Sequence, residues 1–177
     1  MTTLARTSLV VTGWRNVAGD AVGRVKKGMA GFMSTRSDDN FPAGQAELLA
    51  PARTEEGEHR GIGRCPVVDV SEAWEVRSML EVTTPGVELA YETDGLTRTA
   101  FLVHPDGSWA RATAEGLDAP DVHEGGPRRL WLALERIRNR LNAEGGLPLL
   151  GADLRITPDG VCHLSRGRWQ ATMGEDQ

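Results

Sequence analysis

The chain lacks any apolar run long enough to cross a membrane. A transmembrane helix needs about 20 consecutive apolar residues, and charged residues, 25% of the 177, interrupt the hydrophobic stretches. The first residues, Met1–Arg6, lack the apolar core of a secretory signal peptide. We therefore expect a cytoplasmic protein without a membrane partner.

Cysteine and positive charge are also scarce. Two cysteines, Cys65 and Cys162, are too few for a disulfide framework, and we expect both to be reduced. The formal net charge of -5 argues against sequence-independent binding to nucleic acid, which needs a basic surface. We expect no nucleic-acid partner.

The common catalytic and cofactor motifs are absent from the sequence. There is no glycine-rich dinucleotide or phosphate loop, no Cys-x-x-Cys, no His-Glu-x-x-His and no Gly-x-Ser-x-Gly. The motifs therefore give no support to a nucleotide, zinc or α/β-hydrolase function. We expect neither a metal nor a cofactor.

Length and composition predict a single domain over residues 1–177. Domains most often contain roughly 100–150 residues, and apolar residues make up 40% of this chain, enough for a core. Residues 37–66 hold three prolines and a charged run, which predicts a long surface loop with one helical turn near Gln45–Leu49. The polar tail, 170–177, is expected to be frayed.

Alternating and β-branched segments predict several antiparallel strands. Asp94-Gly95 between two such segments is a strong hairpin signal, and Pro105-Asp106-Gly107 starts a second turn, which gives a three-stranded meander. Glycines 23, 28 and 31 inside another strand indicate bulges or close backbone approach. The predicted strands are Ser8–Trp14, Ala21–Arg36, Val87–Thr93, Leu96–Val103, Ser108–Thr113, Ala152–Thr157 and Val161–Leu164.

Two helices are predicted. A short one opens at Asp69–Glu75 with Ser71 as its N-cap and closes at Pro85-Gly86. A long one spans Arg128–Glu144, with Pro127 at its first position and glycines ending it. Its apolar stripe consists of Leu130, Leu134, Ile137 and Leu141. The fold class is therefore α+β: an antiparallel meander and curled sheets, packed by one long amphipathic helix and one short helix.

The long helix carries the most informative surface. At 100° per residue, Arg129, Arg136 and Arg140 fall on one stripe beside the apolar one, and Trp131 lies on the other flank. A guanidinium presents a fixed fork of donors that suits a carboxylate or phosphate. The stripe predicts a binding site for an acidic peptide or small anion; the alternative is a solvated helix face.

One histidine lies where an active site could form. His104 ends a predicted strand beside Asp106, and a histidine paired with a carboxylate can act as a general base. Trp109, Trp131 or Trp14 would then line an apolar substrate pocket. The pattern is a single His near a single Asp in a turn, so a purely structural role is the competing interpretation.

Three segments in a fixed order carry a family resemblance: Asp106–Ala110, Gly126–Trp131 at the start of a helix, and Arg155–Gly160. Over residues 8–168 the chain resembles the C-terminal accessory domain of actinobacterial protein-L-isoaspartate O-methyltransferase-like enzymes, which belong to pathways for ribosomally made peptides such as lanthipeptides. The resemblance implies an α+β domain that helps an enzyme engage a peptide. We expect no methyltransferase domain of the kind that precedes this region in the family, so methyl transfer is not implied.

Two functions follow as hypotheses. The first is a standalone accessory protein that binds a precursor peptide, an acidic small molecule or a biosynthetic enzyme in a specialised pathway. The alternative is a small cofactor-free tailoring enzyme that catalyses an elimination, isomerisation or cyclisation by acid/base chemistry. Dimerisation stays open, because an uncovered edge strand of the meander could pair across a two-fold axis.

Overall fold

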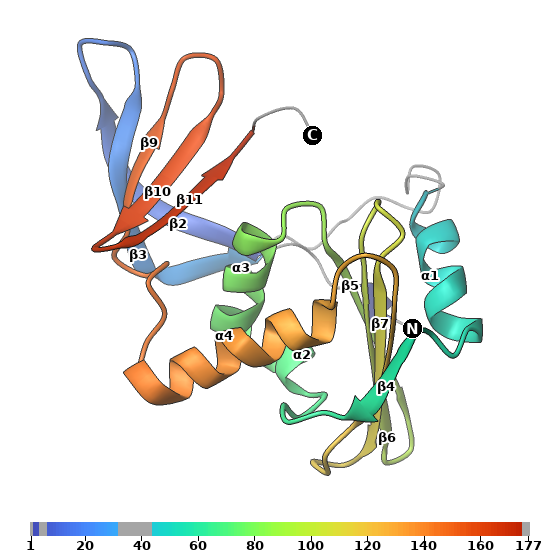
Figure 1. The fold of residues 1–177 in the computed structure, drawn as a ribbon. Coiled ribbons are helices and arrows are strands. Elements are labelled where there is room, and N and C mark those ends of the chain that lie inside the picture. Colours follow the sequence, from blue (N-terminus) through green and yellow to red (C-terminus); the bar gives the residue numbers. More distant parts are fainter. Residues whose placement is uncertain (1, 4–6, 32–43, 175–177) are drawn as a thin grey trace.

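The computed structural model describes residues 2–3, 7–31 and 44–174 and confirms the α+β class (Figure 1). Two antiparallel sheets and four helices make up this part of the chain. Helices α3 (Trp74–Thr83) and α4 (Leu130–Glu144) lie between the two sheets. The predicted meander belongs to one sheet, and the first and last predicted hairpins belong to the other.

The six-stranded sheet has the order β1-β5-β6-β7-β8-β4. Its two predicted turns are confirmed, because Gly95 and Gly107 adopt φ angles of 58° and 87°, which favour glycine. The predicted meander strands are β5, β6 and β7, while β1, β4 and β8 were not predicted. The strands are β1 (Thr2–Thr3), β4 (His59–Ile62), β5 (Glu88–Asp94), β6 (Thr97–Val103), β7 (Trp109–Glu115) and β8 (Asp121–Gly125).

Helices cover both faces of this sheet. Helix α1 (Gly44–Thr54) lies on one face, where Leu49 and Ala52 pack against Phe101 and Trp109. The short α2 (Asp69–Glu72) joins α3 and α4 on the opposite face. The apolar stripe of α4 is buried there as predicted, fully at Leu130, Leu134 and Ile137 and partly at Leu141.

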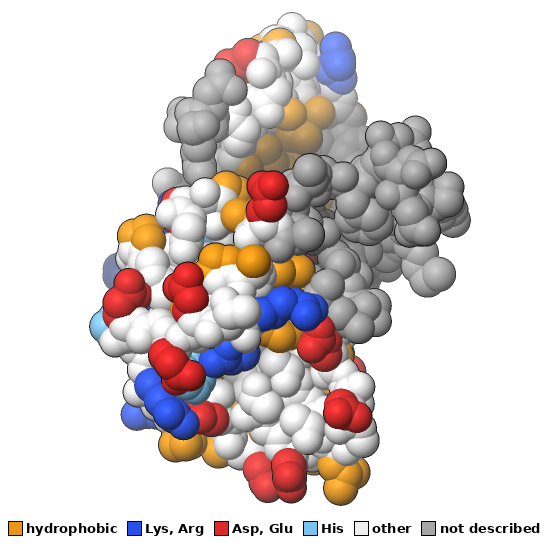
Figure 2. Space-filling model, turned by 90° about the vertical axis from the view of Figure 1, so that its right-hand side faces the viewer, with side chains coloured by type: hydrophobic (Ala, Val, Ile, Leu, Met, Phe, Trp, Pro, Cys, Tyr) orange, Lys and Arg blue, Asp and Glu red, His pale blue; other side chains and the backbone are white. Residues whose placement is uncertain are grey.

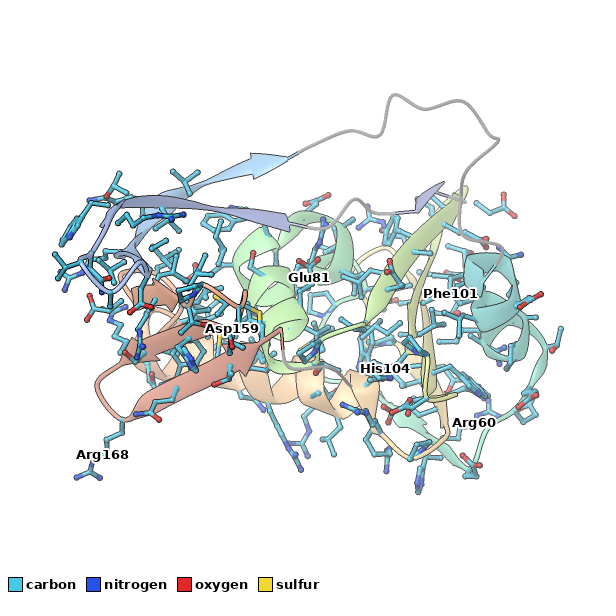
Figure 3. All side chains as sticks on the ribbon, turned by 90° about the horizontal axis from the view of Figure 1, so that it is seen from above. Arg60, Glu81, Phe101, His104, Asp159 and Arg168 are labelled. Carbon is cyan, nitrogen blue, oxygen red and sulfur yellow. The ribbon has the colours of Figure 1, made fainter. Side chains whose placement is uncertain are left out.

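The five-stranded sheet is curled. Its order is β11-β10-β9-β3-β2, so β2 and β11 form opposite edges, and yet α3 contacts both of them. Figure 3 shows the blue β2–β3 pair and the red β10–β11 pair lying apart, with side chains filling the space between them. The strands are β2 (Thr7–Arg15), β3 (Ala21–Gly31), β9 (Asp153–Ile156), β10 (Cys162–Arg166) and β11 (Trp169–Met173).

Close backbone approach explains one of the predicted glycine positions. Gly23 of β3 faces Gly13 of β2, and a Cβ atom on Gly23 would lie 2.5 Å from the carbonyl oxygen of Thr12. The pairing register of the two strands also shifts between Leu9 and Val11, as at a β-bulge. These two features permit the strong bend of the β2–β3 hairpin.

The loop predicted over 37–66 is confirmed only in part: 55–58 and 63–66 lie outside helices and strands, and the helical turn predicted near Gln45–Leu49 falls within a longer helix. Residues Gly44–Thr54 form α1 and His59–Ile62 form β4, while 37–43 lie outside the described residues. Burial of Leu49 and Ala52 against the sheet stabilises α1 despite the internal Pro51. Strand β4 is exposed along its whole length, so it lacks the apolar alternation on which the prediction depends.

The frayed tail predicted over 170–177 is also wrong at its first four residues. Residues Trp169–Met173 form β11, which pairs with β10 in the register Leu164↔Ala171. Trp169, Ala171 and Met173 alternate on the face that packs toward the core. Residues 175–177 lie outside the described part.

The two predicted helix starts need correction. Ser71 does not cap a helix, because its hydroxyl donates to the Val68 carbonyl and the segment breaks into α2 and α3 at Ala73. Helix α4 begins at Leu130 with Arg129 as its N-cap, so Pro127 lies before the helix. The predicted end of α4 is confirmed, since Gly145 is left-handed with φ 69°.

Candidate functional site

The predicted catalytic pair lies within an internal hydrogen-bond network. His104 is 4% exposed, and its Nε2 lies 2.8 Å from the Pro85 carbonyl oxygen. Its Nδ1 lies 2.9 Å from Oδ1 of Asp106 and 3.2 Å from the Asp106 backbone nitrogen. Figure 3 shows His104 where α3 approaches the six-stranded sheet. Both ring nitrogens thus have partners within the chain.

The carboxylate of Asp106 connects this turn to the start of α4. Oδ1 accepts the Ser108 N–H at 2.9 Å, and Oδ2 accepts Nε of Arg128 at 2.5 Å. Partial burial opposes ionisation of Asp106, but hydrogen bonds from Ser108, Arg128 and His104 hold its pKa well below the usual range. Asp106 is therefore a stable anion that orders the β6–β7 turn.

The arginines of α4 are largely neutralised by carboxylates of the same chain. Nε of Arg129 lies 2.7 Å from Glu124, whose side chain is 3% exposed. Nε of Arg140 lies 3.1 Å from Glu144, one turn along the helix. Arg136 is exposed. The structure thus places Arg136 and Arg140 on α4 and Arg129 at its N-cap, and it engages Arg129 and Arg140 internally.

Two of the predicted tryptophans lie on opposite faces of the six-stranded sheet. Trp109 is 3% exposed and packs beneath α1, whereas Trp131 is 2% exposed and belongs to the core beneath α4. The structure does bring Trp131 and Arg129 together, because both line a cavity of about 90 Å³ beside β4. The indole nitrogen of Trp131 has no hydrogen-bond partner among the described residues.

A larger groove, not predicted from the sequence, lies between the five-stranded sheet and α3. Its volume is about 310 Å³. Leu9 from β2 and Met173 from β11 form one wall, and Val82, Pro85 and Val87 form the other. In Figure 2, hydrophobic side chains gather in the recessed upper part of the view, where the five-stranded sheet lies. The alternation of Trp169, Ala171 and Met173 is the one local signal that could have pointed to this face.

The polar atoms at the groove come from α3. Ser78 and Glu81 line it, and Figure 3 shows Glu81 on the side of α3 that faces β2 and β3. The remaining lining is apolar, so the groove is suited to an aliphatic or aromatic side chain.

Neither cysteine has the environment of a nucleophile. Burial is the main cause that raises the pKa of the Cys65 thiol to about 12, and the nearby Asp69 adds to the effect. Burial also raises the pKa of Cys162. Because the thiolate is the reactive form, the raised pKa of each thiol disfavours it as a nucleophile at neutral pH.

Among the described residues there is neither a cluster of potential metal ligands nor a helix that could span a membrane. No group of three or more His, Cys, Asp and Glu side chains lies together there as metal ligands would. None of the helices in the same residues combines the length and apolar character needed to cross a membrane.

Comparison of the chain with protein-family models, with curated proteins and with solved structures found no significant match. The resemblance to a methyltransferase accessory domain therefore stays a prediction. Functional inference depends on the geometry of the chain itself.

Proposed function

We propose that this chain is a peptide-binding protein and that the groove between β2, β11 and α3 receives an apolar side chain of an extended peptide. One observation carries the proposal. The two edges of a curled sheet converge on an apolar groove of about 310 Å³, with Leu9 on one edge and Met173 on the other. Both side chains are only partly buried.

The groove favours a peptide over a small molecule for two reasons. Its volume is near the lower end of the range of small-molecule pockets, about 300–1,000 Å³, and fits one or two side chains. It is also bordered by β11, a strand at a sheet edge, whose backbone groups can hydrogen-bond an extended chain. Peptide recognition commonly combines these two elements, a backbone edge and a side-chain pocket.

The hydrogen bonds of His104 favour binding over the alternative of acid/base catalysis. A general base needs a free lone pair within reach of the substrate. Both ring nitrogens of His104 face groups of the chain itself, and the side chain is 5% exposed. Asp106 is likewise engaged by Ser108 and Arg128.

Ion pairs within the chain likewise argue against the arginines at α4 as the peptide-binding surface. An acidic peptide bound there would compete with Glu124 for Arg129 and with Glu144 for Arg140. An apolar side chain in the groove displaces no such partner. If the chain belongs to a pathway for ribosomally made peptides, as its resemblance implies, the natural ligand is a segment of the precursor peptide.

The test begins with a displayed library of random 12-residue peptides selected on the immobilised full chain. A fluorescein-labelled copy of an enriched peptide is then titrated with three proteins: wild type, Met173→Glu and Thr172→Glu. Met173 lines the groove, whereas its neighbour Thr172 is exposed on the opposite face of β11, so it is a matched control.

We expect Met173→Glu to weaken binding by about tenfold or more, because it places a charge in an apolar groove. Thr172→Glu should change affinity by less than about twofold. The intact mass of the peptide should stay the same after incubation. The proposal is wrong if no peptide is enriched, if the two variants bind alike, or if the peptide changes mass.

A further inference from the structure

The edge strand β2 differs from the other sheet edges that the structure describes. It contains nine residues, against two in β1, four in β4 and five in β11. Within Thr7–Arg15 the single charged residue is the last one, Arg15. Proteins usually protect an edge by making it short or charged, since a long uncharged edge pairs with other strands.

Large hydrophobic side chains stand on the outer face of this edge. Trp14 is 71% exposed and Val10 is 38% exposed, and the alternation along a strand places both on the same face. On the inner face Leu9 and Val11 are only partly buried. An exposed tryptophan beside an unpaired strand edge is typical of an interaction surface.

The backbone pairing identifies which groups face outward. The Asn16 N–H donates to the Asp20 carbonyl at 2.9 Å, so hydrogen-bonded pairs of the β2–β3 ladder occur at every second residue from Asn16. Gly13 and Gly23 form a closely spaced, non-hydrogen-bonded pair, which agrees with this phase. The N–H and C=O groups of Val11, Gly13 and Arg15 therefore point away from β3.

We propose that two copies of this chain pair antiparallel through β2, with Thr12 of each copy facing the partner's Thr12 on a two-fold axis. In this register Val11 exchanges hydrogen bonds with the partner's Gly13, and both residues have outward-facing groups. Val10 then lies directly opposite the partner's Trp14, in a non-hydrogen-bonded pair where side chains are closest. Symmetry forms this contact twice.

The pairing is self-complementary in three respects. Each copy supplies one Val10 and one Trp14, the two exposed hydrophobic residues of the strand, to the other. Threonine opposite threonine is a favourable cross-strand pair. The two Arg15 side chains lie about six residues apart along the paired strands, roughly 20 Å, where salt screens their repulsion. The register shift of the β2–β3 pair lies opposite Val10, where the extra residues belong to β3, and it leaves the segment from Val11 to Arg15 regularly paired.

The test measures the mass of the full chain by light scattering during size-exclusion chromatography over a range of concentrations. We expect wild type to approach twice the chain mass of 19.2 kDa as concentration rises. Thr12→Lys and Thr12→Glu each place like charges face to face on the axis and should raise the dimer dissociation constant by at least about tenfold.

An equimolar mixture of the two variants separates loss of pairing from loss of folding. Opposite charges then meet on the axis, so the mixture should form dimers although each variant alone stays monomeric. Thr172→Lys is the matched control, a threonine-to-lysine change on the other edge of the same sheet, and it should dimerise like wild type. A monomeric wild type, or a Thr12→Lys dimer as strong as wild type, would overturn the proposal.

A cysteine variant tests the register directly. Non-hydrogen-bonded antiparallel pairs have Cα atoms about 4.5 Å apart, which a disulfide can span. Thr12→Cys should therefore give a covalent dimer under mild oxidation, and Thr172→Cys should not. If both variants cross-link to the same extent, the register is wrong.

Discussion

At the scale of single residues, the network around His104 and Asp106 shows how a catalytic pattern can serve the fold. The pair connects three segments: the turn after β6, the Pro85 carbonyl before β5, and Arg128 before α4. Ser108 completes the connection, because its hydroxyl accepts the Arg128 N–H at 2.9 Å. A sequence shows that His104 and Asp106 are close, but it does not show how many partners already occupy them.

We expect Asp106→Asn to lower the free energy of unfolding by about 1–2 kcal/mol at pH 7, since it weakens charge-assisted hydrogen bonds from Arg128 and Ser108. The pKa of Asp106 is depressed in the folded state, so its stabilisation is present above the pKa of the unfolded carboxyl, about 3.9, and is lost as pH falls further. Urea denaturation of both proteins from pH 7 to pH 2 checks this.

The difference in free energy of unfolding between wild type and Asp106→Asn should thus become smaller below about pH 4. Asp118→Asn, at an exposed position in a turn of the same sheet, provides the control and should change stability by less than about 0.5 kcal/mol. If the difference in free energy of unfolding between wild type and Asp106→Asn is the same at every pH, the charge of Asp106 does not contribute to stability.

The buried Glu124 is a partner of Arg129 that the sequence analysis did not identify. Its Oε1 accepts the backbone N–H of Trp131 at 2.7 Å, which satisfies a free donor at the start of α4. Its Oε2 pairs with Arg129. Arg136 and Arg140 lie on the predicted helix and Arg129 lies at its N-cap, but the carboxylate partners come partly from a strand that periodicity did not reveal. From the sequence alone, arginines that are free to bind a ligand could not be distinguished from arginines that are already paired with carboxylates of the chain.

At the scale of elements, the sequence predicted those helices and hairpins that depend on interactions between residues close together in the chain. Helix α4 follows from its apolar spacing and the hairpins from their Asp-Gly turns. Helix α1 and strand β4 depend on contacts with distant residues: α1 is stabilised against β6 and β7, and β4 is held by β8. No window of the sequence contains both partners of such a contact.

The glycine pair of the β2–β3 hairpin gives the element-scale prediction. A Cβ atom at Gly23 would lie 2.5 Å from the Thr12 carbonyl oxygen, and both atoms belong to the backbone, which cannot easily move. We expect Gly23→Ala to lower the free energy of unfolding by about 2 kcal/mol or more. Equilibrium denaturation in urea measures this loss.

Gly61 offers a matched control for this change. It also lies in a strand, β4, but a Cβ atom there would meet nothing within 4 Å. Gly61→Ala should therefore change stability by no more than about 0.5 kcal/mol. Equal effects of the two alanines would mean that the Gly13–Gly23 approach does not constrain the hairpin.

At the scale of the whole molecule, the curl of the five-stranded sheet creates the candidate site. Leu9 and Met173 lie near opposite ends of the chain and on opposite edges of the sheet, yet they line one groove with Val82 and Val87. The strands themselves were partly predictable. The groove was not, because its position depends on how far the sheet curls around α3.

The central claim, that this groove binds an extended peptide, is tested most directly by backbone amide chemical shifts. The ¹⁵N-labelled chain is titrated with the selected peptide, and the shifted amides are mapped onto the structure. We expect the shifted amides to cluster at Leu9, Val82, Gly86, Val87 and Met173. Shifts confined to the arginine face of α4, or none at saturating peptide, would contradict it.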